Sequence, residues 1–202
     1  MEELLGADEN ADPFTPSWRL FGAYFQWGRK PMDTNGNNYK TKLNNGPEGF
    51  VAGPSGPELN ETNEGYVEDW NFNVVEYDAW NLNELSPLKT GNDPCPIGFR
   101  VPTKSEWLSI YEGIEGNWTN VGTNQAYSGG KLVSNSLFLP FNGIRLDGGE
   151  LLTPHWTGNY WSSTNDSTDY ANSVSINYNI PSYLSFDIQY KIYGMGVRCV
   201  AE

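Results

Sequence analysis

The sequence predicts a single loop-rich domain that combines a helix with several short strands around an aromatic core. The chain has 202 residues, which is enough to bury a sizeable core. Its 9 Phe, 8 Trp and 12 Tyr supply large buried areas per side chain. Its 22 Gly and 13 Pro are many for a folded domain, yet fewer than disordered chains carry.

The first part of the chain alternates between polar and aromatic segments. Residues 1–17 are acidic and contain prolines, so we expect a flexible lead-in. WRLFGAYFQWGRK at 18–30 predicts a buried strand or pair of strands. The Gly and Pro residues of 44–65 predict a long loop, which we interpret as an insertion in one domain spanning 18–202. Residues 66–85 show no clean period and are expected to be weakly structured.

VPTKSEWLSIYEGIEG at 101–116 predicts a helix. Thr103 is a candidate N-cap, and Glu106 follows three residues later, as in a capping box. Gly116 predicts the end of the helix. The apolar residues at helical spacing are Trp107, Ile110, Tyr111 and Ile114.

The second half is expected to be rich in strands. KLVSNSLFLPFNGIRL at 131–146 and the closing segment 190–202 both predict strands. A Gly-apolar-Arg-apolar pattern occurs at 98–101, 143–146 and 196–199. We interpret its arginines as structural ion pairs in an acidic chain, with chance repetition as the alternative.

The net charge of −13 argues against nucleic acid and anionic membrane surfaces as partners. Solubility is the ordinary explanation of this charge, and bound cations are the second. No apolar run approaches the ~20 residues that cross a bilayer, so we expect no membrane insertion. The N-terminal EELLGADENADPF is unlike a signal peptide, which leaves a chain made without export or a mature segment behind an added Met.

Catalytic motifs are missing from the sequence. His155 is the only histidine, and neither a G-x-S-x-G elbow nor a phosphate-binding loop occurs. Paired carboxylates for glycoside hydrolysis stay open, but nothing singles out one pair among 25 acidic residues. We assign no catalytic residue and predict that the protein is not an enzyme.

Calcium is the one cofactor that the sequence leaves open. DTNGNNYK offers Asp33, Asn35 and Asn37 at alternate positions, as at the start of an EF-hand loop. Its glycine comes two positions early, however, and the twelfth position lacks the bidentate Glu. Turns at 147–150 and 165–169 also carry carboxylates. We assign no cofactor and no metal ligand.

The two cysteines, Cys95 and Cys199, stand 104 positions apart, with no Cys/His spacing typical of zinc. They are either free and buried or joined in one disulfide. We favour the disulfide, which would stabilise the fold by about 4–5 kcal/mol on the chain-entropy model.

Five motifs occur in a recognisable order. They are YFQWGRK (24–30), DPCPIGFRVPTKSEW (93–107), LFLPFNGIR (137–145), YWSST (160–164) and GMGVRCV (194–200). Together they resemble the major paralogous domain family first named from Fibrobacter succinogenes, which is abundant in secreted and surface proteins of Bacteroidetes. The resemblance covers residues 18–202.

This resemblance implies an α+β domain with the C-type lectin-like fold, related to formylglycine-generating enzymes. It implies antiparallel strands, one or two helices and long loops over one face. It also implies that Cys95 lies near Cys199 on the last strand, and that the protein is extracellular or at the cell surface, although this chain carries no export signal. Both cysteines belong to structural motifs, which departs from the enzyme branch and its reactive cysteines. A Glu-Pro-Asn type calcium motif of sugar-binding C-type lectins is also lacking.

Residues 160–190 have a composition similar to that of an antibody paratope. Of these 31 residues, 16 are Ser, Asn or Tyr, which give rigid contact area and adaptable hydrogen bonds. Val174 and Ile176 alternate with polar residues, which predicts a strand with one buried and one open face. The residues expected to be exposed and to bind ligand are Asn165, Asp166, Asp169, Tyr170, Ser173, Ser175, Asn177, Tyr178, Asn179 and Tyr183.

A second, looser resemblance links this stretch to retroelement-diversified variable proteins, which use the same fold and vary near the C-terminus. A plain polar binding loop and a solvated strand edge are the alternatives. The sequence thus predicts an adhesin-like module that binds a glycan or a protein on a cell surface through 160–190. The alternatives are a structural pilus or surface-lipoprotein subunit and, if Met1 is native, a phage tail receptor-binding protein.

Overall fold

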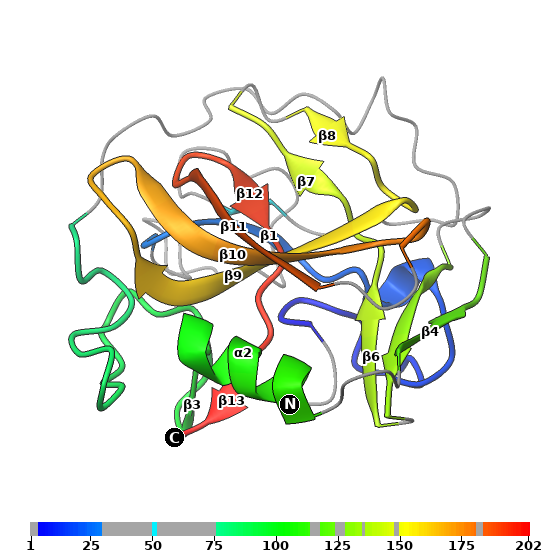
Figure 1. Ribbon diagram of the computed structural model, residues 1–202, viewed down its shortest axis with the longest axis horizontal. Coiled ribbons are helices and arrows are strands. Elements are labelled where there is room, and N and C mark those ends of the chain that lie inside the picture. The colour runs from blue at the N-terminus through cyan, green and yellow to red at the C-terminus, as the bar shows by residue number, and fades with distance from the viewer. Residues whose placement is uncertain are drawn as a thin grey trace.

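The computed structural model describes residues 4–29, 50–51, 76–113, 118–123, 128–134, 136–147, 150–180 and 184–202. Within these residues the chain forms four antiparallel sheets and one α-helix, so the expected strand-rich α+β class is confirmed (Figure 1). The elements are the 3-10 helix η1 (Trp18–Leu20), β1 (Tyr24–Gln26), β2 (Phe50–Val51), β3 (Phe99–Arg100), α2 (Lys104–Gly113), β4 (Trp118–Val121), β5 (Gly130–Val133), β6 (Leu137–Pro140), β7 (Ile144–Arg145), β8 (Leu151–Leu152), β9 (Thr157–Asn165), β10 (Tyr170–Asn177), β11 (Leu184–Tyr190), β12 (Gly194–Met195) and β13 (Val200–Ala201).

The longest strands form a three-stranded sheet in the order β11-β10-β9. Val174 in β10 lies between Phe186 of β11 and Tyr160 of β9. These apolar residues form one face, which packs on α2 through a cluster that includes Trp107. The face is buried because apolar residues alternate along β10, as the sequence predicted for Val174 and Ile176.

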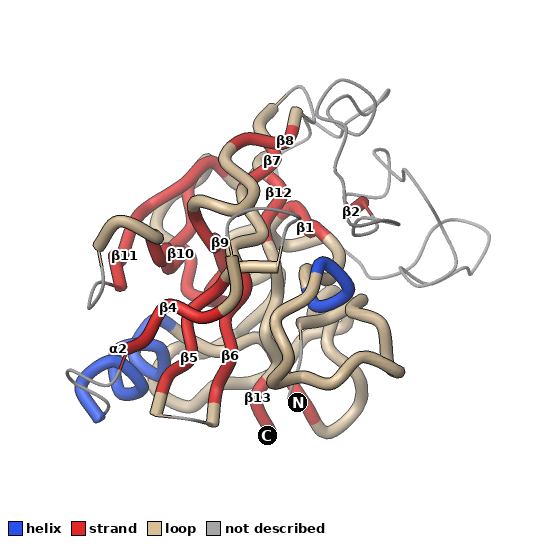
Figure 2. Tube along the Cα trace, turned by 90° about the vertical axis from the view of Figure 1, so that its right-hand side faces the viewer, coloured by secondary structure: helices blue, strands red, loops and turns tan. Residues whose placement is uncertain are grey.

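Short strands complete the fold around this sheet. A five-stranded sheet runs in the order β2-β1-β12-β7-β8, β13 pairs with β3, and β4-β5-β6 form a meander (Figure 2). The closing segment therefore contributes two strands to two sheets, where one strand was expected. The 18–30 segment contributes η1 and the short strand β1, and all of β1 is buried.

The core is aromatic, as the composition predicted. Trp27, Trp80 and Trp161 are fully buried in one cluster with Phe25. Buried indole N–H groups require acceptors, and these find them in the backbone. Trp27 donates to the carbonyl of Ser162 at 2.8 Å, and Trp161 donates to that of Phe25 at 2.7 Å.

The predicted helix and its capping box are confirmed. The backbone N–H of Glu106 donates to Thr103 Oγ1 at 3.2 Å, and that of Thr103 donates to Glu106 Oε2 at 2.8 Å. Arg100 also donates to Glu106 Oε2 at 2.7 Å, so the ion-pair interpretation holds for this arginine. Arg145 instead lies over the ring of Tyr24, 4.9 Å from its centroid. The expected helix end at 114–116 lies outside the described residues.

The disulfide between Cys95 and Cys199 is confirmed, with their Cα atoms 5.9 Å apart. The buried carboxylate of Asp93 organises the segment that leads into it. Asp93 accepts the N–H groups of Cys95 at 2.8 Å and Val101 at 2.9 Å, and it pairs with Lys89 at 2.6 Å. Desolvation raises the pKa of Asp93 against the opposing effect of these hydrogen bonds.

The start of the chain differs from the expected flexible lead-in. Leu4 and Leu5 are buried in the core. The N–H of Leu5 donates to the carbonyl of Val197, and its carbonyl accepts the N–H of Ala23, both at 2.9 Å. The polar composition of 1–17 led to the expectation of a flexible segment, although two leucines within it pack in the core beside the last strands.

The expected loop insertion at 44–65 and the segment 66–75 lie outside the described residues, apart from β2. Residues 76–85 are described and form a turn-rich segment. Among the described helices, none is long and apolar enough to cross a membrane.

Candidate functional site

The sequence-predicted site residues fall into two groups at opposite ends of β10. The β9–β10 hairpin carries Asn165, Asp166, Asp169 and Tyr170, whereas the following turn carries Asn177, Tyr178 and Asn179. Asn177 lies seven positions after Tyr170 along β10, or about 23 Å at 3.3 Å per residue. The structure does not bring these residues into one site. Tyr183 lies outside the described residues.

Two serines in the middle of β10 are less exposed than the sequence predicted. Ser173 is buried, with 3% of its surface exposed, and its hydroxyl donates to the carbonyl of Asp187 at 3.3 Å. Ser175, half-buried, donates to Asp187 Oδ2 at 2.9 Å, and Ser185 donates to Oδ1 at 2.8 Å. These hydroxyls donate within the sheet, to the backbone carbonyl or the carboxylate of Asp187 on β11.

The hairpin end carries a cluster of tyrosines. The rings of Tyr170 and Tyr190 lie 4.4 Å apart, and those of Tyr190 and Tyr193 lie 5.4 Å apart. A hydrogen bond with Tyr190 is the main cause that raises the pKa of Tyr170 to about 12. The phenol of Tyr170 therefore stays neutral at physiological pH.

The turn end carries a second aromatic cluster. Trp156, partly exposed, meets the ring of Tyr178 edge-on at 5.5 Å, and Phe141 meets the same ring at 6.0 Å. The carbonyl of Tyr178 accepts the side-chain amide of Asn120 at 2.8 Å. Tyr178 is thus held by packing on two sides.

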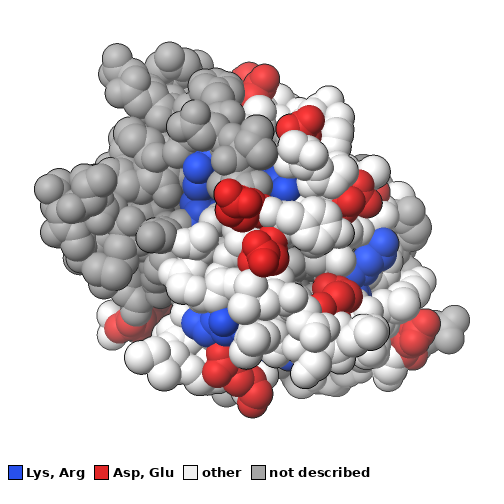
Figure 3. Space-filling view, turned by 90° about the vertical axis from the view of Figure 1, so that its left-hand side faces the viewer, with Lys and Arg blue, Asp and Glu red and all other residues white. Residues whose placement is uncertain are grey.

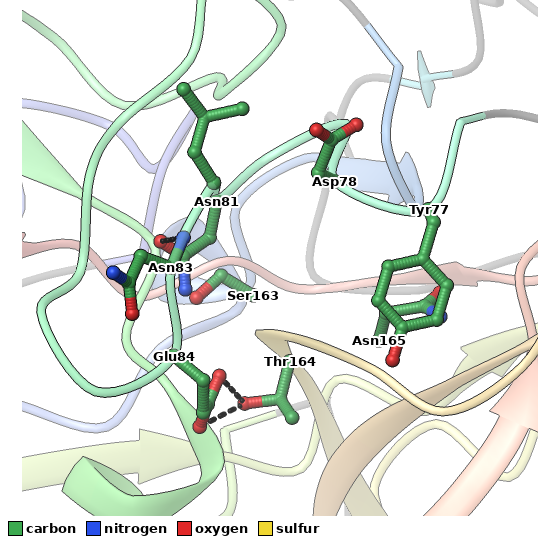
Figure 4. A pocket seen from close by; sticks show the side chains of 9 residues that line it. Tyr77, Asp78, Asn81, Asn83, Glu84, Ser163, Thr164 and Asn165 are labelled. Carbon is green, nitrogen blue, oxygen red and sulfur yellow. Dashed lines mark hydrogen bonds between the residues drawn. The ribbon is translucent and has the colours of Figure 1, made fainter.

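A pocket of about 190 Å³ opens beside the hairpin end of β9 (Figure 4). The loop 77–84 forms one side and the end of β9 the other. Most of its lining residues are of polar type: Tyr77, Asp78, Asn81, Leu82, Asn83, Glu84, Ser163, Thr164 and Asn165. Only Asn165 belongs to the residues that the sequence predicted.

Glu84 and Thr164 join the two sides of the pocket. The hydroxyl of Thr164 lies 2.8 Å from both carboxylate oxygens of Glu84 and accepts the N–H of Lys104 at 2.7 Å. Desolvation is the main cause that raises the pKa of Glu84, with a smaller contribution from the negative charge of Glu106. The pocket is thereby anchored to the first residue of α2.

Two asparagines shape the loop side through Asx turns. Asn81 Oδ1 accepts the N–H groups of Asn83 at 3.2 Å and Leu88 at 2.9 Å. Asn83 Oδ1 accepts those of Leu85 at 3.0 Å and Ser86 at 3.2 Å. Since backbone donors fix both amide oxygens, the conformation of the loop is set by its own side chains.

The strand side contains buried polar atoms that lack partners. Ser163 Oγ and both side-chain polar atoms of Asn165 are buried and make no hydrogen bond within the described structure. Such groups are rare in folded proteins because an unmade hydrogen bond costs about 1–3 kcal/mol. Both residues belong to the lining of the pocket, although these three atoms are themselves buried.

The face of the molecule around the hairpin carries charges of both signs. Figure 3 views the side that is at the left of Figure 1, where the 77–97 segment and the β9–β10 hairpin lie. Acidic and basic side chains are interspersed there, and the described part of the surface shows no continuous basic patch. Within the described residues, no group of three or more His, Cys, Asp or Glu side chains is placed to hold a metal ion.

Sequence reasoning missed the loop side of this site. The 66–85 segment was expected to be weakly structured because it lacks a regular period. The signal present was the spacing of Asn81 and Asn83, which are residues that form Asx turns. No protein-family model, curated protein or solved structure matches the chain.

Proposed function

We propose that the chain is a non-enzymatic ligand-binding domain of the C-type lectin-like fold, acting as an adhesin-like module outside the cell or at its surface. The antiparallel sheets and single helix support this proposal. So does the disulfide that ties the end of the chain to the segment before α2, since disulfides persist in oxidising environments.

One observation carries the proposal: the lining of the pocket at the hairpin end of β9 includes two polar side chains, Ser163 and Asn165, with buried atoms that have no hydrogen-bond partner in the described structure. Ser163 and Asn165 pay a desolvation penalty that no contact within the described structure offsets. Groups of this kind are expected where a protein is built to meet a ligand rather than to pack on itself.

The proposed ligand is a glycan or a protein on a cell surface, bound at the hairpin end. Asp166 and Asp169 are exposed beside the pocket residue Asn165, and Tyr170 is half-buried. Tyr170 and Tyr190 add a rigid aromatic surface there. Aromatic rings with adjacent polar groups are typical of paratopes and of sugar-binding surfaces.

Binding of the purified domain to a glycan array and to bacterial and host cell surfaces tests this function. A hairpin variant carries Asp166→Ala and Asp169→Ala, and a matched turn variant carries Asn177→Ala and Asn179→Ala at the other end of β10. We expect saturable binding that the hairpin variant weakens and the turn variant retains.

The reverse pattern would move the site to the turn end and contradict the assignment to the hairpin. An absence of binding on every surface, with the domain folded, would overturn the proposed function. The structural subunit would then be the better explanation, and self-association of the domain would be the measurement that follows.

A further inference from the structure

Strand β11 forms one edge of the three-stranded sheet, because it pairs with β10 on one side and with no described strand on the other. In Figure 2 it lies at the outline of the described chain. All seven of its residues pair in register with β10, whereas the pairing of β9 with β10 contains an irregularity. β11 therefore offers a regular edge to a further strand.

Alternate residues of β11 direct their backbone polar groups away from β10. The N–H of Lys191, just beyond the strand, donates to the carbonyl of Asp169 at 2.9 Å. Because hydrogen-bonded pairs alternate along an antiparallel ladder, the odd-numbered residues of β11 also bond towards β10. The N–H and C=O groups of Phe186 and Ile188 then point to the open side, where no described residue bonds to them.

The edge also lacks the usual protection against pairing. Natural edge strands commonly carry Lys, Pro or a bulge, and the sequence LSFDIQY of β11 has none of these. Its one charge is engaged, because the carboxylate of Asp187 accepts the hydroxyls of Ser175 at 2.9 Å and Ser185 at 2.8 Å. Ile188 and Tyr190 are large apolar side chains with 54% and 42% of their surface exposed.

We infer that β11 pairs with β11 of a second copy of this chain, antiparallel, about a twofold axis at Ile188. In this register Ile188 faces the partner's Ile188, Phe186 faces the partner's Tyr190, and Asp187 faces the partner's Gln189. The backbone groups that point outward on the two strands then meet, so ladder hydrogen bonds close along the pair. Two three-stranded sheets become one continuous sheet.

Charge selects both the occupant and the register. Two copies of a chain with a net charge of −13 repel each other over most of their surface, but the open edge of β11 brings no like charges together in this register. An axis one residue earlier would set the two Asp187 carboxylates directly opposite, which destabilises a strand pair. The axis at Ile188 instead lets the amide of Gln189 donate to the partner's Asp187. FDIQY is thus complementary to itself, which a foreign strand would not require.

The pair would also extend the aromatic surface at the hairpin end. Tyr190 lies 4.4 Å from Tyr170 between ring centroids, and in the pair it gains the partner's Phe186 on its other side. Pairing does not depend on what the hairpin binds. If the hairpin binds a ligand, the pair presents two hairpins on one sheet.

Sedimentation of the intact chain over a range of concentrations tests the inference. We expect a monomer–dimer equilibrium with a Kd of about 0.1 mM or below, because a single strand pair belongs with the small, transient interfaces. Added salt should tighten the association, since it screens the repulsion between two acidic copies.

A lysine at the axis should prevent pairing. Ile188→Lys sets two ammonium groups opposite each other and is expected to weaken association at least tenfold. Leu108→Lys makes the same change of charge at an exposed position on α2 and is the matched control, which should associate as the wild type does.

Two substitutions at Gln189 test the register. Gln189→Glu faces the partner's Asp187 with a like charge and should weaken association about threefold or more, whereas Gln189→Lys should strengthen it by a similar factor. In a pair centred on Asp187, position 189 would face the partner's Ser185, and the two variants would not differ in this way. Thermal unfolding of the monomers should show that both variants stay folded.

A crosslink places the axis directly. Opposed residues of a hydrogen-bonded antiparallel pair have Cα atoms about 5.5 Å apart, which is within the range of a disulfide. Ile188→Cys should therefore form a covalent dimer under mild oxidation. Gln189→Cys faces the partner's Asp187 rather than itself and should remain uncrosslinked.

Three results would overturn the inference. They are a chain that stays monomeric up to about 1 mM, ten times the expected Kd, a dimer that Ile188→Lys leaves intact, and association that continues beyond two copies. None of them bears on ligand binding at the hairpin, which the variants at Asp166 and Asp169 test separately.

Discussion

Thr164 holds the carboxylate of Glu84 beside the start of α2: its hydroxyl lies 2.8 Å from both oxygens of Glu84 and accepts the N–H of Lys104. A second carboxylate, that of Glu106, caps the same helix end through Thr103. The two glutamates have pKa values shifted in opposite directions, because burial dominates at Glu84 and hydrogen bonds prevail at Glu106.

Glu84→Gln is expected to remove a pH-dependent loss of stability. The folded state raises the pKa of Glu84 above 4.5, so it binds the proton more tightly than the unfolded state does. This contribution is present at pH values below 4.5 and is lost as the pH rises through the raised pKa. Urea unfolding should show the wild type losing stability relative to Glu84→Gln between pH 4.5 and pH 7. A difference that stays constant or grows with pH would contradict the raised pKa.

Glu106→Gln is expected to show the opposite sign. Desolvation alone would raise the pKa of Glu106, but hydrogen bonds from Arg100 and Thr103 outweigh it and lower the pKa below 4.5. The stabilising contribution is present above 4.5 and is lost as the pH falls through the lowered pKa. At pH 7 the variant should lose about 1 kcal/mol, as capping substitutions do, in a urea titration. Glu112→Gln, exposed on the same helix, is the control and should unfold as the wild type does.

Lys131→Met tests whether burial destabilises the charged form of Lys131. Desolvation lowers the pKa of Lys131 from 10.5 to about 8, although its Nζ donates to Asn120 Oδ1 at 3.0 Å and to the carbonyl of Ile180 at 2.9 Å. The unfolded state binds the proton more tightly between these values, so the wild type should gain stability relative to Lys131→Met from pH 8 to pH 10. The gain cannot exceed about 1.4 kcal/mol per pH unit. Chemical unfolding across this range measures it, and equal pH slopes in the two proteins would exclude the shift.

Removal of the disulfide is expected to cost a large part of the stability. Cys95 and Cys199 close a segment of 104 residues, and losing such a crosslink typically lowers the free energy of unfolding by about 2–5 kcal/mol. The double variant Cys95→Ala, Cys199→Ala should show this loss in urea unfolding. Reduction of the wild type with dithiothreitol should give a similar midpoint, and unchanged midpoints in both would rule out the stabilising role.

Local chemistry made the helix predictable from the sequence. Thr103 and Glu106 are three residues apart, and their reciprocal hydrogen bonds depend only on that spacing. The strand character of Val174 and Ile176 was equally readable, because their period of two matches the buried face of β10. With only two cysteines, a single disulfide was possible, and we favoured it over two free buried cysteines.

The features that the sequence did not predict depend on contacts between segments that are far apart in the chain. Ser173 resembles an exposed residue in the sequence, but β11 places Asp187 opposite it and buries it. The pocket likewise forms only when the 77–84 loop meets β9, which lies about 80 residues later in the chain. Composition predicted a binding surface over 160–190, but it gave no indication that Glu84 and Asn81 would line a pocket beside β9.

The hydrogen bond between Leu5 and Val197 also determines how the domain transmits mechanical force. A pull on the C-terminal end peels β13 from β3 and then reaches the covalent link between Cys199 and Cys95. A pull on the N-terminal segment enters at Leu5, directly beside Val197. The shortest path for this force between the two ends therefore runs through Leu5, Val197 and Cys199. This path adjoins β9, because Gly196, next to Val197, exchanges backbone hydrogen bonds with Asn159 and Trp161.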